Sequence, residues 1–291
     1  MKIKNSVSYY IFQVINTILL VAIGFITLYP FWHVIVRSLL PYSESIKSSI
    51  VIIPTKITFE AYKHVFSQAR LLNGLFISVG VTITGTIYQL LITAMAAYGF
   101  TRKELPGRKI LFFIIVLTMF FSGGLIPTYL LIKNLKLVDN LLVLVLPYAI
   151  SAYNMIIMRT FFSSLPPELE ESATIDGAGQ FKIFFRIIVP LSVPVIAIIS
   201  LFVAVANWNN WYGPMLYLNK PSLWPLALVL RDILIDANIS DKNAAYQSAD
   251  FLLNESVKMA VVIVSLVPIV AIYPFIQKYF AKGVLLGAVK L

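Results

Sequence analysis

Residues 168–190 read ELEESATIDGAGQFKIFFRIIVP, a polar and acidic stretch between long apolar runs. Pro166 and Pro167 precede three glutamates, a pattern that suits the positively polarised first turn of a helix. Gly177 can adopt the positive φ that ends a helix, and phenylalanines then recur at helical spacing before Pro190. The stretch therefore predicts a helix, a turn and a second helix on one side of a membrane.

The rest of the chain has the composition of a membrane protein. Hydrophobic residues make up 59% of its 291 residues and charged residues 12%, against roughly 25% charged in soluble domains. Uncharged runs that approach or exceed the roughly 20 residues needed to cross a bilayer cover 11–36, 71–100, 110–132, 140–158, 187–219 and 259–277. The fifth run is too long for one helix, so we end that span near Asn207. We predict an all-α integral membrane protein with six transmembrane helices.

The net charge of +10 does not indicate a nucleic-acid partner, because the basic residues cluster in short segments beside the spans. This arrangement is typical of cytoplasmic loops. If six spans alternate, both termini and the 168–190 stretch are cytoplasmic. The first apolar run is too long for a cleavable signal peptide and no small-x-small site ends it, so we read it as a retained span.

Several kinds of chemistry are missing from the sequence. No Asp, Glu, Lys or Arg lies within the six runs, whereas ion-driven carriers use buried ionisable groups. There is no Gly-x-x-x-x-Gly-Lys-Ser/Thr loop for a nucleotide, no cysteine, and only His33 and His64 as histidines. We therefore expect no catalytic residue, metal or cofactor in this chain. An ion-driven secondary carrier and a membrane-embedded enzyme are the alternatives, and each predicts charged clusters in or beside the spans.

The 168–190 stretch resembles the cytoplasmic coupling loop of binding-protein-dependent ABC importer permeases. That family's pattern is Glu-Ala-Ala, three residues, Gly, nine residues, Ile, one residue and Leu-Pro. Here Glu171-Ser172-Ala173, Gly177, Ile187 and Val189-Pro190 keep the spacing. The Ile-Asp-Gly-Ala run at 175–178 and the C-terminal run from Gln277 are similar to the carbohydrate branch of the family, of the maltose type and closest to permeases for complex oligosaccharides.

The resemblance implies a type I ABC importer transmembrane fold with a cytoplasmic coupling helix. The residues that it assigns to the ATPase contact are Glu171, Ser172, Ala173, Asp176, Gly177 and Pro190, with Gly283, Gly287 and Lys290 in a tail contact. We divide the chain into an N-terminal transmembrane helix and outer loop (1–70), a transmembrane domain with the coupling loop 166–190 (71–280) and a cytoplasmic tail (281–291). We expect the two tail glycines to make the tail flexible or turn-forming.

The resemblance also implies partners. A permease of this kind works with a second homologous permease on a different chain, two ATPase subunits that bind ATP and Mg, and an extracellular solute-binding protein. The chain itself would be no enzyme, and its substrate would be an oligosaccharide or polysaccharide fragment. Membrane lipid would surround the chain. A permease for a non-sugar solute is the alternative within the family.

Sugars favour aromatic faces together with amide and hydroxyl partners. Residues of these types before and after the fifth span are Tyr148, Tyr153, Asn154, Asn207, Trp208, Asn210 and Trp211. We predict that they line the substrate path, although interfacial anchoring is an equal explanation for the tryptophans. The long outer loop, 212–256, is the predicted surface for the binding protein. Ser78, Thr82 and Thr86 share one helix face, which predicts close packing within this chain or against a partner permease.

Overall fold

The computed structural model describes residues 7–41, 44, 52–54, 56–240 and 255–288, and all regular structure in these residues is helical. The chain divides into two compact units. The smaller unit consists of residues 1–68 and 232–266, and the larger unit of residues 69–231 and 267–291. Two helices, α13 (Leu226–Ser240) and α14 (Glu255–Ala288), contribute to both units.

In the smaller unit, α1 (Val7–Ser38) is an apolar helix whose side chains are exposed over most of its length, as expected of a helix in lipid, while Val36 and Ser38 near its end are buried. It includes the predicted first span. Its end is tied to α14 by Arg37 Nη1, which lies 3.2 Å from Glu255 Oε2, and Lys258 Nζ lies 3.6 Å from the other oxygen of that carboxylate. A short helix, α3 (Glu60–Ser67), follows in the same unit.

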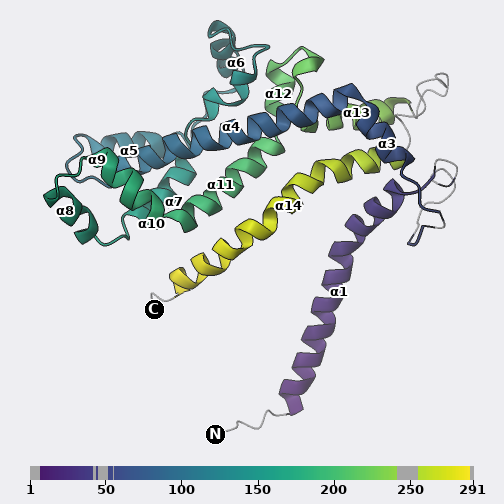
Figure 1. Cartoon of the computed structure of the whole chain (residues 1–291), viewed down its shortest axis with the longest axis horizontal. Helices are drawn as coiled ribbons and strands as arrows, with labels where there is room; N and C mark the ends of the chain where they lie inside the picture. The colour runs from purple at the N-terminus through teal and green to yellow at the C-terminus, as the bar shows by residue number, and fades with distance from the viewer. Residues whose placement is uncertain (1–6, 42–43, 45–51, 55, 241–254, 289–291) are drawn as a thin grey trace. The chain divides into compact units, whose positions relative to one another are not determined.

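The larger unit is built around α4 (Ala69–Gly99), and the shorter helices α7 (Ala152–Phe162) and α11 (Val193–Trp208) pack against part of it (Figure 1). The small-residue face of α4 packs within this chain. Ser78 Oγ is buried and accepts a hydrogen bond from the backbone N–H of Leu226 at 2.8 Å. A Cβ built on Gly85 would lie 3.0 Å from Asn207 Nδ2 on α11. Ser78 and the neighbouring Gly85 therefore pack within the protein, whereas the hydroxyls of Thr82 and Thr86 are buried without a hydrogen-bond partner among the described residues.

The predicted third span, 110–132, is not one helix. The helix α5 (Arg108–Leu117) ends, and α6 (Leu125–Asn134) begins after a turn. Gly124 in this turn has φ +84°, and its backbone N–H donates to Ser122 Oγ at 3.2 Å. A positive φ and a local side-chain bond both interrupt helical hydrogen bonding, which explains the break.

The fourth and fifth predicted spans are bent. Two 3₁₀ turns, η1 (Leu141–Leu144) and η2 (Leu146–Tyr148), precede α7 at a bend of 47°. The series α9 (Gln180–Ile183), a π-helical turn η3 (Phe184–Ile188) and α10 (Val189–Leu191) meets α11 at 83°. Pro190 and Pro194 lack the N–H that would continue the helix there. In the described part of the chain, three helices are long and apolar enough to cross a membrane, or up to five with each bent pair as one span; six stays a prediction.

Two other segments differ from expectation. The predicted outer loop 212–256 contains α12 (Tyr212–Tyr217), the 3₁₀ turn η4 (Pro221–Leu223) and α13, while its residues 241–254 lie outside the described part. The tail was expected to be flexible or turn-forming at its glycines, but α14 continues through Gly283 and Gly287 to Ala288. In a helix of 34 residues, the many neighbouring residues that favour helix outweigh the weak helix propensity of two glycines. Lys290 lies outside the described residues.

Candidate functional site

The coupling loop 166–190, called the elbow below, begins with α8 (Glu168–Ile175) and a tightly defined turn. Gly177 has φ +77°. Its N–H donates to the carbonyl of Thr174 at 3.0 Å, and the N–H of Ala178 donates to the carbonyl of Ala173 at 2.9 Å. These two bonds form a Schellman motif, in which the residue at the position of Gly177 is left-handed. The turn has one geometry, and glycine adopts it without strain.

The second half of the elbow is embedded in the core of the larger unit. Ile183, Phe184 and Ile188 are buried there. The ring of Tyr98, near the end of α4, lies 5.2 Å from the ring of Phe184. Figure 1 shows α9 close to one end of α4, with α8 next to α9. The buried side chains fix the direction of the elbow relative to α4.

Polar contacts also fix the elbow to α4. Arg102 forms an ion pair with Glu170 of α8, and its guanidinium lies over the Tyr98 ring at 4.4 Å. The Tyr98 hydroxyl accepts a hydrogen bond from Arg102 and donates to Gln180 Oε1 of α9 at 3.2 Å. One cluster thus connects α4 to both helices of the elbow. From the sequence, Arg102 was assigned only to the basic charge of a loop and Glu170 only to the helix dipole, because nothing local to either residue indicates the pairing.

The outward face of the elbow is exposed and carries large apolar side chains. Ile175 is 86% exposed and Phe181 is 70% exposed. Of the residues predicted to contact an ATPase, the exposed ones are Glu171, Ser172, Asp176, Gly177 and Pro190. Ala173 is half-buried and packs toward the core instead. Apolar side chains exposed in a polar segment are typical of a surface that binds another protein.

A groove lies beside the elbow. Its volume is about 530 Å³, and its lining residues are Met95, Tyr98, Gly99, Arg102, Glu104, Gln180, Phe181 and Phe184. It lies between the end of α4 and the start of α9. The groove adds a concave surface next to the exposed Phe181 of α9.

A second candidate region, the aromatic cluster, consists of Tyr148, Trp211, Tyr212 and Tyr217. The rings of Trp211 and Tyr212 meet edge to face at 5.6 Å. Asn210 Oδ1 accepts the N–H of Gly213 at 3.1 Å, and a Cβ on that glycine would lie 3.1 Å from the Tyr148 hydroxyl oxygen. The start of α12 therefore closely approaches η2. Tyr212 and Tyr217 were not predicted as site residues.

The phenol of Tyr217 stays protonated over a wide pH range. Burial raises the pKa of Tyr217, and the nearby Tyr148 and Tyr212 raise it further. Its ring stacks on Tyr129 of α6 at 6.0 Å. Because Tyr217 is buried, its neutral phenol supports the cluster from inside the protein.

Asp139 forms hydrogen bonds with the segment that follows the aromatic cluster in the chain. Its N–H donates to the carbonyl of Tyr217 at 2.9 Å. Its Oδ1 accepts the N–H groups of Asn219 at 2.6 Å and Lys220 at 3.2 Å. Desolvation by itself would raise the pKa of Asp139, but the hydrogen bonds from Asn219 and Lys220 outweigh it and lower the pKa below its ordinary value. Asp139 thus joins the loop after α6 to the segment after α12.

The other predicted path residues lie elsewhere. Tyr153 is exposed and Asn154 is buried, both on α7. Asn207 faces Gly85, and its Nδ2 is buried without a hydrogen-bond partner among the described residues. Trp208 is buried. The structure therefore brings together Tyr148, Asn210 and Trp211 of the predicted set.

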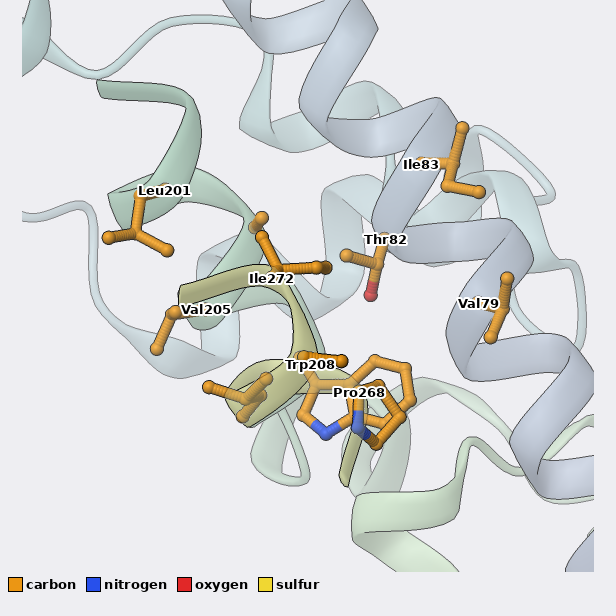
Figure 2. A pocket seen from close by; sticks show the side chains of 11 residues that line it. Val79, Thr82, Ile83, Leu201, Val205, Trp208, Pro268 and Ile272 are labelled. Carbon is orange, nitrogen blue, oxygen red and sulfur yellow. The ribbon is translucent and has the colours of Figure 1, made fainter. Parts of the chain in front are cut away.

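Trp208 lines an apolar cavity of about 340 Å³ between α4, α11 and the middle of α14 (Figure 2). Thr82 contributes a hydroxyl, while the other ten lining residues are Val79, Ile83, Leu201, Ala204, Val205, Trp208, Pro268, Ile269, Ala271 and Ile272. Such a wall suits an apolar group and offers little to sugar hydroxyls. The cavity does not support a role for Trp208 in sugar binding.

Comparison with known proteins gives a consistent result. Residues 89–286 match the family described as binding-protein-dependent transport system inner membrane component. The chain is 43% identical over 272 residues to the polygalacturonan/rhamnogalacturonan transport system permease protein YtcP of Bacillus subtilis (strain 168), covering 93% of this chain and 95% of that protein. It is 41% identical over 280 residues to protein LplC of the same organism, covering 96% and 95%.

A solved structure agrees with these relatives. The crystal structure of a bacterial ABC transporter involved in the import of the acidic polysaccharide alginate includes a chain with a TM-score of 0.88 to this one. The two chains are 29% identical, and the match covers 96% of this chain and 100% of the other. The broken third span and the bent fourth and fifth spans thus belong to a fold that is already known in an importer.

Proposed function

The chain belongs to the family of inner membrane components of binding-protein-dependent transport systems, and from this premise we propose that it carries an oligosaccharide or polysaccharide fragment across the bacterial cell membrane as a permease subunit of an ABC importer. It is not an enzyme, since ATP hydrolysis belongs to separate subunits. Its similarity to a permease for polygalacturonan and rhamnogalacturonan and to an alginate importer supports a carbohydrate cargo.

The geometry of the elbow carries the mechanistic part of the proposal. Its outward face exposes Ile175 and Phe181 for a partner, while its inward face is fixed to α4 by buried side chains and by the Arg102–Glu170 ion pair. A displacement imposed on the exposed face is then transmitted to α4 instead of being absorbed by a flexible loop. The 31 residues of α4 extend about 46 Å at 1.5 Å per residue, which is long enough to cross a bilayer.

The proposal includes the assembly around this chain. Two ATPase subunits bind ATP and Mg and contact the elbow on the cytoplasmic side, where both termini also lie. A second homologous permease on a different chain completes the path. An extracellular solute-binding protein delivers the sugar to the surface formed by 212–256. The positive-inside distribution of Lys and Arg supports this orientation.

The absence of cysteine from the sequence permits a direct test of orientation and contact. In the complete importer, Ile175→Cys should crosslink to an ATPase subunit and react only with membrane-permeant thiol reagents. Lys220→Cys, also at an exposed position, is the matched control, and it should react with impermeant reagents from outside. Labelling of Ile175→Cys by an impermeant reagent in intact cells would overturn the proposed orientation.

The carbohydrate cargo needs a separate measurement. In proteoliposomes that contain the complete importer, ATPase activity should rise when the solute-binding protein and its oligosaccharide are added together. An ion-driven carrier would instead respond to an ion gradient without ATP. Stimulation by amino acids and by no saccharide would support the non-sugar alternative.

A further inference from the structure

An arginine that the sequence did not single out lies against the aromatic cluster. The guanidinium carbon of Arg231, on α13, lies 4.6 Å from the centroid of the Trp211 ring. Both residues belong to the larger unit. Trp211 is 39% exposed and Arg231 is partly exposed, so a ligand at the cluster can reach both side chains.

The charge of Arg231 is not matched within the described part of the chain. Ion pairs in that part of the chain, such as Arg37 with Glu255 and Arg102 with Glu170, do not involve Arg231. Asp139, the carboxylate below the cluster, already accepts hydrogen bonds from Asn219 and Lys220. A guanidinium stacked on an indole keeps the N–H groups at its edge available, in a planar fork that fits a carboxylate.

A second Arg–Trp pair in the same unit shows what a structural pair looks like. Arg70 lies 5.1 Å from the Trp224 ring centroid. Trp224 is half-buried against the hydrophobic core, and its indole N–H donates to the carbonyl of Leu218 at 2.9 Å. That tryptophan is held by packing and by its own hydrogen bond. By contrast, Trp211 is 39% exposed and its ring contacts the exposed ring of Tyr212.

We propose that Arg231, oriented by Trp211, binds the carboxylate of an acidic sugar residue, so that the substrate of this permease is an anionic, uronate-containing oligosaccharide. This inference rests on the proposed carbohydrate transport. The rings of Tyr148 and Tyr212 supply apolar faces for the sugar rings, and Arg231 supplies two parallel hydrogen bonds to the carboxylate. Because a neutral sugar would leave the guanidinium without this partner, the site favours the charged substrate.

The test compares substrates that differ only in charge. The complete importer, with its own solute-binding protein, is reconstituted, and ATPase stimulation is measured with trigalacturonate, with its fully methyl-esterified form and with a neutral trisaccharide. Wild type should respond best to trigalacturonate. Arg231→Gln should lower the specificity for the acid over the ester by about tenfold, as expected for loss of hydrogen bonds to a charged group. Arg70→Gln is the matched control and should leave that ratio unchanged.

The outcomes are distinct. An unchanged acid-to-ester ratio in Arg231→Gln, or a wild-type preference for the ester or the neutral trisaccharide, overturns the inference and leaves the proposed function standing. A lack of response to every saccharide overturns both. If Arg231→Gln does not assemble, Arg231→Lys replaces it; this variant keeps the charge but loses the fork, and a drop of about threefold for the acid alone is expected.

Discussion

The elbow and the aromatic cluster lie against the same helix but are built in different ways. The elbow is anchored at Tyr98, near the end of α4, whereas the hydrophobic core below the cluster includes Val81. These positions are about 25 Å apart along the helix. The elbow takes its shape from hydrogen bonds between residues close in sequence, with one ion pair added. The cluster takes its shape from segments that are distant in sequence, such as Asp139 with Asn219. The elbow is held rigid by its own local hydrogen bonds, so it can transmit a displacement. The aromatic cluster is assembled from several segments, so its surface can change to suit a ligand.

The largest effect is expected from changing the turn of the elbow. Gly177→Val places a β-branched residue at φ +77°, where even an ordinary side chain costs about 1–2 kcal/mol. Uptake should be abolished, and the amount of protein in the membrane should stay the same. Gly177→Asn is the matched control, because asparagine tolerates the left-handed region. Equal uptake by Gly177→Val and wild type would show that the turn geometry is not needed.

Breaking the ion pair between Arg102 and Glu170, which links the elbow to α4, should have the next largest effect on uptake. In Arg102→Glu, uptake should fall severalfold while the stimulated ATPase activity is retained. The double variant Arg102→Glu with Glu170→Arg should recover part of the loss, with a coupling energy of about 1 kcal/mol, because both side chains are partly exposed. Absence of any recovery in the double-mutant cycle would mean that Arg102 acts through Tyr98 alone.

The packing between α4 and α11 should have a moderate effect. Gly85→Ala puts a methyl group 3.0 Å from Asn207 Nδ2 and should lower the free energy of unfolding by about 1 kcal/mol. Gly80→Ala, in the same helix but with no atom within 4 Å of the added methyl, is the control and should not destabilise. Thermal unfolding in detergent measures both. If Gly80→Ala were the more damaging change, the contact with Asn207 would not limit this packing.

The smallest effect is expected from Asp139, which supports only the cluster. Because the pKa of Asp139 is lowered in the folded protein, its stabilising contribution is present above the ordinary value of 3.8 and is lost as pH falls through the lower folded-state pKa. Asp139→Ala should therefore unfold at a lower temperature than wild type at pH 7, and the difference should shrink toward pH 3. Tryptophan fluorescence of Trp211 and Trp224 follows the transition. A difference that grows on acidification would contradict the assignment.

The sequence predicted the elements of the elbow well. Its helix, its turn at Gly177 and its second helix are all present, since proline, glycine and spaced phenylalanines act on neighbouring backbone. The sequence did not reveal the break near Gly124 or the bends before α7 and α11. Hydropathy measures only whether a run is apolar, and irregular backbone at membrane depth is tolerated where other parts of a protein satisfy it.

The sequence by itself determined that the chain lies in a membrane, that it carries a stiff polar elbow outside the hydrocarbon, and which family it resembles, because these depend on composition and on local spacing. Only the tertiary structure decided that Arg102 pairs with Glu170, that Ala173 faces inward, and that Arg231 lies over Trp211. Each of these facts depends on which helix lies beside which. Contacts between distant residues are set by the packing of the whole unit, and no local pattern encodes them.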